Sequence, residues 1–190
     1  VLPSVQFPKE PAENNIFSGI LIAGKDKNIM GVQWSVLVSS VENSFTGWQH
    51  TGIAGQIKGT GYGFQEAGLF AKCADFYGAQ TAGLACMAGD FTGFQASGIY
   101  NWADNTHGCQ IAGIFNKADA FRGVAIAGIY NWVNNVNGWQ IAGIFNKADI
   151  FDGWAVSGVG SWASNVSGWQ LSGVVNKADN VTGVQTAGVV

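Results

Sequence analysis

The residues of this chain that could take part in chemistry are few, and they do not gather into a catalytic pattern. The two histidines, His50 and His107, have no serine, cysteine or carboxylate at a recognisable motif spacing, so we interpret both as structural or solvent-exposed. No set of acid, base, nucleophile and metal ligands converges anywhere in the sequence. We therefore expect no enzyme, no cofactor and no bound metal.

Lysine and aspartate recur at a fixed interval. The segment Asn-Lys-Ala-Asp occurs at 116–119, 146–149 and 176–179, which places a Lys–Asp pair every thirty residues. Such pairs at turns are most simply a solvated, mildly stabilising surface. Cation binding by a row of aspartates is the alternative, but the Gly-Gly-x-Gly-x-Asp repeat of calcium-binding β-helices is absent.

The three cysteines, Cys73, Cys86 and Cys109, are odd in number and lack metal-ligand spacing. Each replaces a residue of a recurring pattern, so we interpret them as buried thiols. A disulfide between Cys73 and Cys86 in neighbouring units is the alternative that the sequence leaves open.

Glycine sets a regular period along the chain. The first two intervals between leading glycines are sixteen residues and every later interval is fifteen. A short fixed period indicates one structural unit whose copies bury their faces against their neighbours. The leading glycines are Gly31, Gly47, Gly63, Gly78, Gly93, Gly108, Gly123, Gly138, Gly153, Gly168 and Gly183. We expect an all-β protein, a β-solenoid of about eleven 15-residue repeats.

The repeat has a strict pattern when its leading glycine is called position 1. Position 3 is glutamine in nine units, position 5 is Ala, Ser or Thr, position 7 is aliphatic, position 9 is asparagine in five units, and position 11 is mostly alanine. Because side chains of a strand alternate, we expect the odd positions to share one face. The even positions are apolar but varied, and the glycine content excludes a helix.

Stacking of these units predicts columns of side-chain amides. In a parallel solenoid equal positions lie about 4.8 Å apart, and an amide ladder satisfies polar groups that would be costly to bury unpaired. We expect interruptions at Ala125, Ala155, Gly160 and Ser161. The expected ladder residues are Gln65, Gln80, Gln95, Gln110, Gln140, Gln170, Asn101, Asn116, Asn131, Asn146 and Asn176.

A second rhythm of thirty residues lies over the first, because Asn-Lys-Ala-Asp units alternate with Asn-Trp units at 101–102 and 131–132. It fits a flattened coil with two fifteen-residue sides, or a hairpin with two different turns. An antiparallel meander or a 12-stranded outer-membrane β-barrel, which counts residues 16–24 as a strand, is therefore the alternative fold. A closed barrel needs net stagger around its circumference, and near-identical steps supply none, so we favour the solenoid.

Composition bounds the organisation and the partners. All three prolines fall in residues 1–15, which we expect to form an extended N-terminal arm before a single β-repeat domain over 16–190. Charged residues are 11% of the chain, against about 25% in ordinary soluble domains. Nine Lys and Arg with a net charge of −3 exclude the basic stripe of a nucleic-acid-binding protein. So few charges indicate either that the protein has unusually little surface or that it turns apolar surface toward a membrane or toward further copies of the chain.

The aromatic residues are the leading candidate for a functional surface. Their rings either fill the core between two sheets, or lie outward and meet lipid, glycan or another protein copy. The tryptophans of this candidate surface are Trp102, Trp132, Trp139, Trp154, Trp162 and Trp169.

The phrase Val/Phe-x-Gly-x-Gln-x-Ala-Gly-Ile-x-Asn-x-Ala resembles the short repeat of the leptospiral-type surface-repeat family, and proteins of gut Bacteroidota resemble it too. The segments Val5-Gln-Phe-Pro8, Ile20-Leu-Ile-Ala-Gly24 and Gly31-Val-Gln-Trp34 resemble the opening of such proteins, so the likeness covers essentially the whole chain. It implies an exported protein at the cell surface or outer membrane of an outer-membraned bacterium. It implies no enzymatic activity, no agreed ligand and no catalytic residues to transfer.

Two functional hypotheses follow. The first is a non-enzymatic surface protein that acts as a scaffold, an adhesin or a self-assembling subunit, with other copies or other surface proteins as partners. The second is an outer-membrane β-barrel with aromatic rings at the lipid boundary. Membrane contact stays open as a further option, and nucleic acid is not an expected partner.

Overall fold

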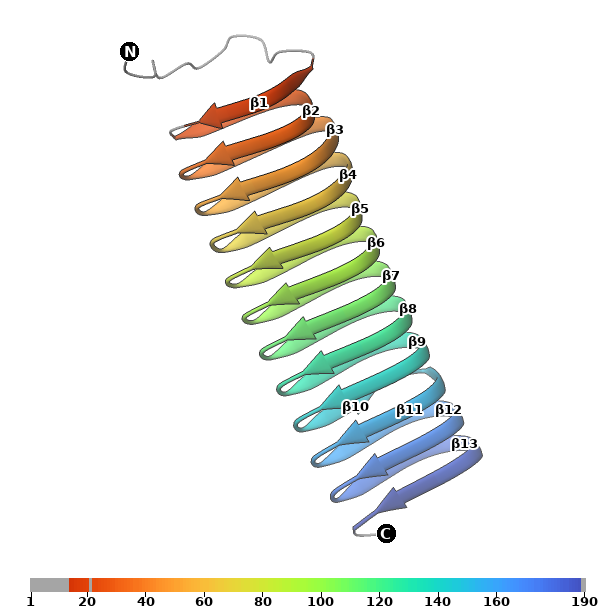
Figure 1. Ribbon diagram of the computed structural model, residues 1–190. Helices are drawn as coiled ribbons and strands as arrows, with labels where there is room; N and C mark the ends of the chain where they lie inside the picture. The colour runs from red at the N-terminus through yellow and green to blue at the C-terminus, as the bar shows by residue number, and fades with distance from the viewer. Residues whose placement is uncertain (1–13, 21, 189–190) are drawn as a thin grey trace.

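Thirteen β-strands, each parallel to the strands it pairs with, form a stack of coils in the computed structural model, which describes residues 14–20 and 22–188 (Figure 1). The stacking confirms the expected β-solenoid, so the antiparallel meander and the 12-stranded barrel are wrong. Most of the expected N-terminal arm, residues 1–13, lies outside the described residues, and Asn15 already belongs to the first strand.

The strands cover nearly all of the described chain. They are β1 (Asn15–Ile20), β2 (Ala23–Ser35), β3 (Val38–Thr51), β4 (Ala54–Ala67), β5 (Phe70–Ala82), β6 (Ala85–Ser97), β7 (Tyr100–Ala112), β8 (Phe115–Ala127), β9 (Tyr130–Ala142), β10 (Phe145–Lys147), β11 (Ile150–Ser157), β12 (Gly160–Ser172) and β13 (Val175–Ala187). β10 and β11 are two pieces of one coil, because both pair with β9 on one side and with β12 on the other.

The register between coils equals one repeat. Gly108 pairs with Gly123, which pairs with Gly138, and equal positions face each other along the rest of these strands. One fifteen-residue repeat therefore completes one coil. The interpretation that two fifteen-residue sides make one coil is wrong, because a single repeat already contains both sides. The thirty-residue rhythm instead distinguishes alternate coils.

Each coil is flattened, with two sides that meet at two edges (Figure 1). At one edge a tight turn at repeat positions 6 and 7 separates successive strands, as Gly128 and Ile129 separate β8 from β9. We call this the turn edge. At the other edge the strand itself bends at positions 12 to 15, as over residues 119–122 of β8. We call this the bend edge.

The two edges shift the alternation of side chains. The buried residues of β8 are Asn116, Ala118, Phe121, Ala125 and Ala127. Even-numbered side chains point inward before the bend and odd-numbered side chains point inward after it, so the strand does not alternate regularly through the bend. Repeat position 14 thereby joins the core. Position 7 leaves it, because the turn directs its aliphatic side chain outward. The expectation that position 7 shares one face with positions 3, 5, 9 and 11 is therefore wrong.

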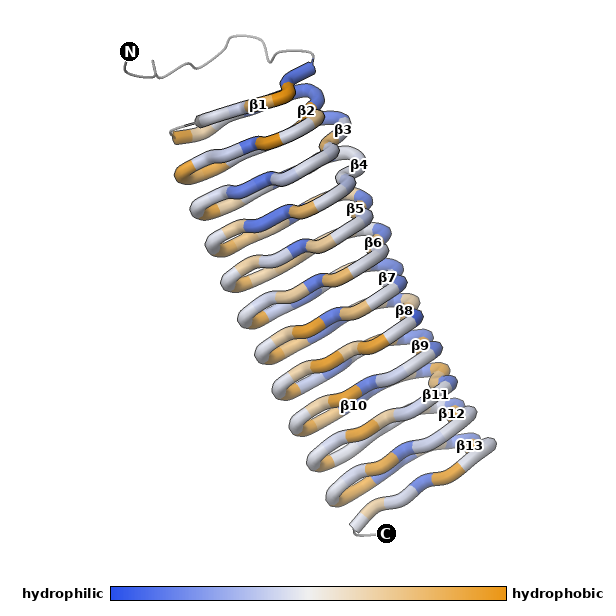
Figure 2. The backbone as a smooth tube through the Cα atoms, viewed as in Figure 1, coloured by the Kyte–Doolittle hydropathy of each residue, from blue (hydrophilic) through white to orange (hydrophobic). Residues whose placement is uncertain are grey.

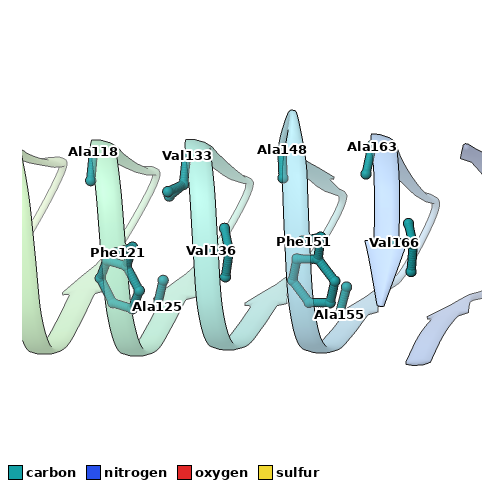
Figure 3. Close-up of a cluster of buried hydrophobic side chains, with 10 residues drawn as sticks. All are labelled: Ala118, Phe121, Ala125, Val133, Val136, Ala148, Phe151, Ala155, Ala163 and Val166. Carbon is teal, nitrogen blue, oxygen red and sulfur yellow. The ribbon is translucent and has the colours of Figure 1, made fainter. Parts of the chain in front are cut away.

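Small side chains let the two sides of the coil approach closely. In the core cluster of Figure 3, Phe and Val alternate from coil to coil at position 14, where the rings of Phe121 and Phe151 lie. The other residues of the cluster are mostly alanines. In the preceding coils the corresponding rings of Phe76 and Phe91 stack with their centroids 6.2 Å apart. This packing removes apolar surface from water at about 25 cal/mol per Å².

The glycine period has a steric cause. All eleven leading glycines have positive φ angles, from 115° to 147°. A Cβ atom on Gly108 would lie 2.0 Å from the carbonyl oxygen of Gly93 in the preceding coil, and the other leading glycines are similarly confined. Only glycine combines this backbone conformation with so close an approach.

Candidate interaction surface

The interior of the solenoid holds an unbroken glutamine ladder from Gln33 to Gln110. In each step the side-chain Nε2 donates to the Oε1 of the glutamine one coil earlier, over 2.6 to 2.7 Å. Gln33 ends the series by donating to Asp26 over 2.7 Å. Farther along, Gln185 donates to Gln170 over 2.7 Å. The six glutamines from Gln33 to Gln110 are fully buried, so the ladder satisfies amides that water cannot reach.

The asparagine ladder runs in the opposite direction. Asn101 donates to Asn116, Asn116 to Asn131 and Asn131 to Asn146, over 2.9 to 3.0 Å. Each of these side chains also donates to a backbone carbonyl across the coil, as Asn116 does to Ile126 over 2.6 Å. The series ends where Ser161 replaces the next asparagine, and Asn176 donates instead to the carbonyls of Gln170 and Thr186.

The glutamine ladder is interrupted at Ala125 and Ala155. On either side of Ala125, the Oε1 of Gln110 and the Nε2 of Gln140 are buried without a hydrogen-bond partner among the described residues. These are the acceptor and the donor that a glutamine at position 125 would satisfy in the direction of the ladder. Such a glutamine would need room, because Val133 packs in the same core cluster as Ala125.

We expect the double variant Ala125→Gln/Val133→Ala to be more stable than the wild type by about 1–3 kcal/mol, because it pairs two buried polar groups. Urea unfolding measured by circular dichroism checks this. Ala125→Gln alone should gain less, since it overpacks against Val133. A double variant no more stable than Val133→Ala alone would contradict the ladder geometry.

The six candidate tryptophans all lie on the outside, between 37% and 50% exposed, so the interpretation that they fill the core is wrong for them. They form two columns on different sides of the coil. Trp139, Trp154 and Trp169 stack directly, with ring centroids 5.6 and 5.1 Å apart and planes within 14°. Trp102, Trp132 and Trp162 are two coils apart and belong to the other column.

Lysines fill the gaps in that second column. Lys117 lies between Trp102 and Trp132, with its Nζ 5.8 and 5.4 Å from the two ring centroids, and the Nζ of Lys147 is 4.7 Å from the Trp132 ring. Such cation–π contacts are each worth about 0.5–1 kcal/mol at exposed sites. The thirty-residue rhythm of the sequence is therefore an alternation of Trp and Lys along one column.

A third aromatic column runs beside the second. The rings of Tyr100, Phe115, Tyr130 and Phe145 stack with centroids 5.3 to 5.7 Å apart. Burial raises the pKa of the Tyr100 and Tyr130 phenols. In these stacks the ring faces are turned toward one another, so the ring edges are what remains for an outside partner. The columns therefore suit edge contacts with an apolar surface better than face-to-face stacking on a sugar.

The turn edge forms a strip without charge. From 36–38 to 173–175, no residue at repeat positions 6, 7 or 8 is charged. The aliphatic side chains at position 7 are exposed, among them Ile99, Ile114, Ile129 and Ile144 at 42% to 45%. Figure 2 shows apolar colour at this edge and hydrophilic residues along the bend edge. The sequence signal was the Gly-aliphatic pair at positions 6 and 7, which marks a turn.

The titratable candidates stay apart from one another. His50 hydrogen-bonds Glu66 over 3.1 Å, and His107 is exposed at the bend edge. Asp119 and Asp149 are exposed, and Asn134 donates to Asp119 over 3.1 Å. Within residues 14–20 and 22–188 no three His, Cys, Asp or Glu side chains are placed to share a metal ion.

The three cysteines are free, so the disulfide between Cys73 and Cys86 is wrong. Cys73 and Cys86 are buried, whereas Cys109 is half-buried on the outer face. Burial raises the pKa of Cys73 to about 12 and also raises the pKa of Cys86. Both thiols therefore stay protonated and hydrogen-bonded to backbone carbonyls, Cys73 to that of Asp75 and Cys86 to that of Ala96.

We expect only Cys109 to react with a thiol reagent in the native protein at about pH 8, because Cys73 and Cys86 are enclosed in the core whereas Cys109 is half-buried, while burial raises the pKa of all three thiols. All three should react in concentrated guanidinium chloride. The folded state retains protons on Cys73 that the unfolded chain loses above its ordinary pKa of 9.0, so stability should fall as the pH rises from 9.0 toward about 12. Mass spectrometry of the labelled peptides reads out the pattern, and rapid native labelling of Cys73 would contradict it.

The two edges of the described solenoid differ in polarity. A charge-free turn edge lies between two sides that carry aromatic columns, and the opposite edge is polar. None of the described segments is a helix long and apolar enough to cross a membrane. No protein-family model, no curated protein and no solved structure matches this chain.

Proposed function

We propose that this protein is a non-enzymatic scaffold, exported to the surface of an outer-membraned bacterium, whose copies associate side by side through their turn edges. The single observation that carries the proposal is the charge-free strip of exposed aliphatic residues at repeat positions 6 to 8. The resemblance of the repeat to bacterial surface-repeat proteins supports the location.

The strip supports association because it is continuous. Exposed apolar patches larger than a few hundred Å² mark interaction surfaces on soluble proteins. Here the side chains at position 7 recur in every coil, from Leu37 to Val174, and at position 8 the rings Tyr100, Phe115, Tyr130 and Phe145 extend the patch onto one side.

A second copy is the partner that fits this strip best. Any other copy carries the same side chains at the same spacing of about 4.8 Å per coil. A contact made by one coil is therefore repeated by the next, and a two-fold axis lets each copy use the same surface. A lipid surface has no such spacing, so it would gain nothing from the regularity of the column.

Sedimentation velocity across the micromolar range tests this proposal. We expect reversible association of the wild type, and Ile114→Lys/Ile144→Lys at the turn edge should weaken it at least about tenfold, because it places charges in an apolar contact. Asn135→Lys, which changes an exposed residue at the bend edge, is the matched control and should associate like the wild type. A wild type that stays monomeric throughout, or one that binds uncharged phosphatidylcholine vesicles in place of itself, would overturn the proposal.

A further inference from the structure

We propose that the bend edge carries a binding groove for a neutral, linear oligosaccharide. The groove has a volume of about 680 Å³ and extends along the edge from Tyr77 to Asp152, over several consecutive coils. It lies on the edge opposite the charge-free strip, so this binding is independent of side-by-side association.

The groove is built by the bend of each strand. Because the alternation of side chains is interrupted at the bend, the side chain at position 14 points into the core and forms the floor of the groove. The side chains at positions 13 and 15 lie on either side of it and form the walls. In β7 these three residues are Asn105, Thr106 and His107. The same arrangement in the coils before and after extends the groove along the stack.

The floor holds a polar group that the protein does not satisfy. Thr106 is only 4% exposed, and its hydroxyl oxygen is buried without a hydrogen-bond partner in the part of the chain that the structure describes. In the adjacent coils its place is taken by the rings of Phe91 and Phe121. An unpaired buried hydroxyl costs about 1–3 kcal/mol. Since this oxygen is closed off from the groove, the contacts to a ligand come from the walls at positions 13 and 15.

The walls offer hydrogen-bonding groups of both kinds. Asn105 donates to Asp90 over 2.7 Å and Asn137 donates to Asp152 over 3.4 Å, which orients each amide and leaves the second carboxylate oxygen open to a donor. Arg122 adds a guanidinium with donors only, one coil from His107. Hydroxyl groups both donate and accept, so a polyhydroxyl ligand can use this mixture fully.

The charge balance favours a neutral ligand. Two carboxylates, Asp90 and Asp152, line the groove with a single arginine, Arg122. The excess of negative charge disfavours a sulfated or phosphorylated chain, and the arginine in the middle disfavours a polycation.

The shape favours a linear chain and disfavours a peptide. The wall at position 15 carries a polar side chain in every coil from Tyr77 to Asp152, at the strand spacing of about 4.8 Å, which suits a ligand of regular repeat. The wall at position 13 is interrupted by Ala120 and Ile150. An extended peptide would bind by adding a strand to an open sheet edge. No such edge borders the groove over β6 to β9, because the strands there are paired with neighbours on both sides.

Isothermal titration calorimetry on the full chain tests the proposal, with cellohexaose, mannohexaose and maltohexaose as neutral probes and a heparin hexasaccharide as the charged one. We expect at least one neutral probe to bind. Arg122→Ala/Asn137→Ala should weaken that binding at least tenfold, because it removes two hydrogen-bonding side chains from the wall of the groove.

Thr46→Val, which changes an exposed residue on the same edge outside the groove, is the control and should bind like the wild type. Ile114→Lys/Ile144→Lys should also bind normally, which separates this site from association at the turn edge. Binding of none of the neutral probes, binding of the heparin probe alone, or equal binding by the wild type and the groove variant would each overturn the proposal.

Discussion

Gly108→Ala is expected to destabilise the protein by about 3 kcal/mol or more. The φ angle of Gly108 is 140°, and a Cβ atom there would lie 2.0 Å from the carbonyl oxygen of Gly93. That oxygen belongs to backbone paired within the sheet, so it cannot move aside alone. Urea unfolding followed by circular dichroism measures the loss.

Gly160→Ala is the matched control. Its Cβ atom would meet the ring of Phe145 at 2.8 Å, and a ring on the outer face can shift. The equivalent position holds Tyr100, Phe115 or Tyr130 in other coils, so a larger side chain fits there. We expect a loss below about 1 kcal/mol. Equal losses for the two variants would mean that close stacking at the leading glycines does not set the repeat.

The second large effect is expected for Gln80→Leu. The side chain of Gln80 donates to Gln65 over 2.7 Å and accepts from Gln95 over 2.7 Å, with all three residues fully buried. Leucine keeps most of the volume but leaves one acceptor and one donor unpaired. At about 1–3 kcal/mol for each buried unsatisfied group, the loss should be about 2–5 kcal/mol.

Gln185→Leu makes the same chemical change at an exposed end of a ladder, where Gln185 donates to Gln170 alone. It should cost less than about 1 kcal/mol, because water can replace the lost amide. The same urea titration compares the two variants. If Gln80→Leu were as mild as Gln185→Leu, the interior ladder would contribute little to stability.

The stacking of the coils could be predicted from the sequence because its causes are local and repeated. A glycine forced by a close backbone approach, such as Gly123, recurs at the period of the coil, and a glutamine that must bond its own copy recurs with it. Both the glycine period and the glutamine period can be recognised in a single sequence. They also located the interruption at Ala125.

The path of the chain within a coil could not be predicted in the same way. Strict alternation placed the aliphatic residues at position 7, such as Ile129, on the same face as the ladder residues. The turn exposes them instead and the bend brings in position 14, such as Phe121. Both changes depend on where the side chains of a strand stop alternating between the two faces, and no single residue type marks that place in the sequence. The same shift of phase creates the groove at Thr106, so that site could not be anticipated either.

Disulfide trapping at the turn edge tests the central claim of side-by-side association most directly. The background protein must contain no free thiol. Each native cysteine is therefore replaced by the residue that occupies the same repeat position one coil away. These changes are Cys73→Ala, Cys86→Ala and Cys109→Val. Single cysteines are then placed at the turn edge by Ile99→Cys, Ile129→Cys or Val159→Cys, and at the bend edge by Asn135→Cys.

We predict that at least one turn-edge cysteine forms covalent dimers rapidly under mild oxidation at micromolar concentration, because residues near a two-fold axis meet their own copies. The bend-edge cysteine should react only slowly by random collision. Dimers that form no faster at the turn edge than at the bend edge would contradict the proposed scaffold.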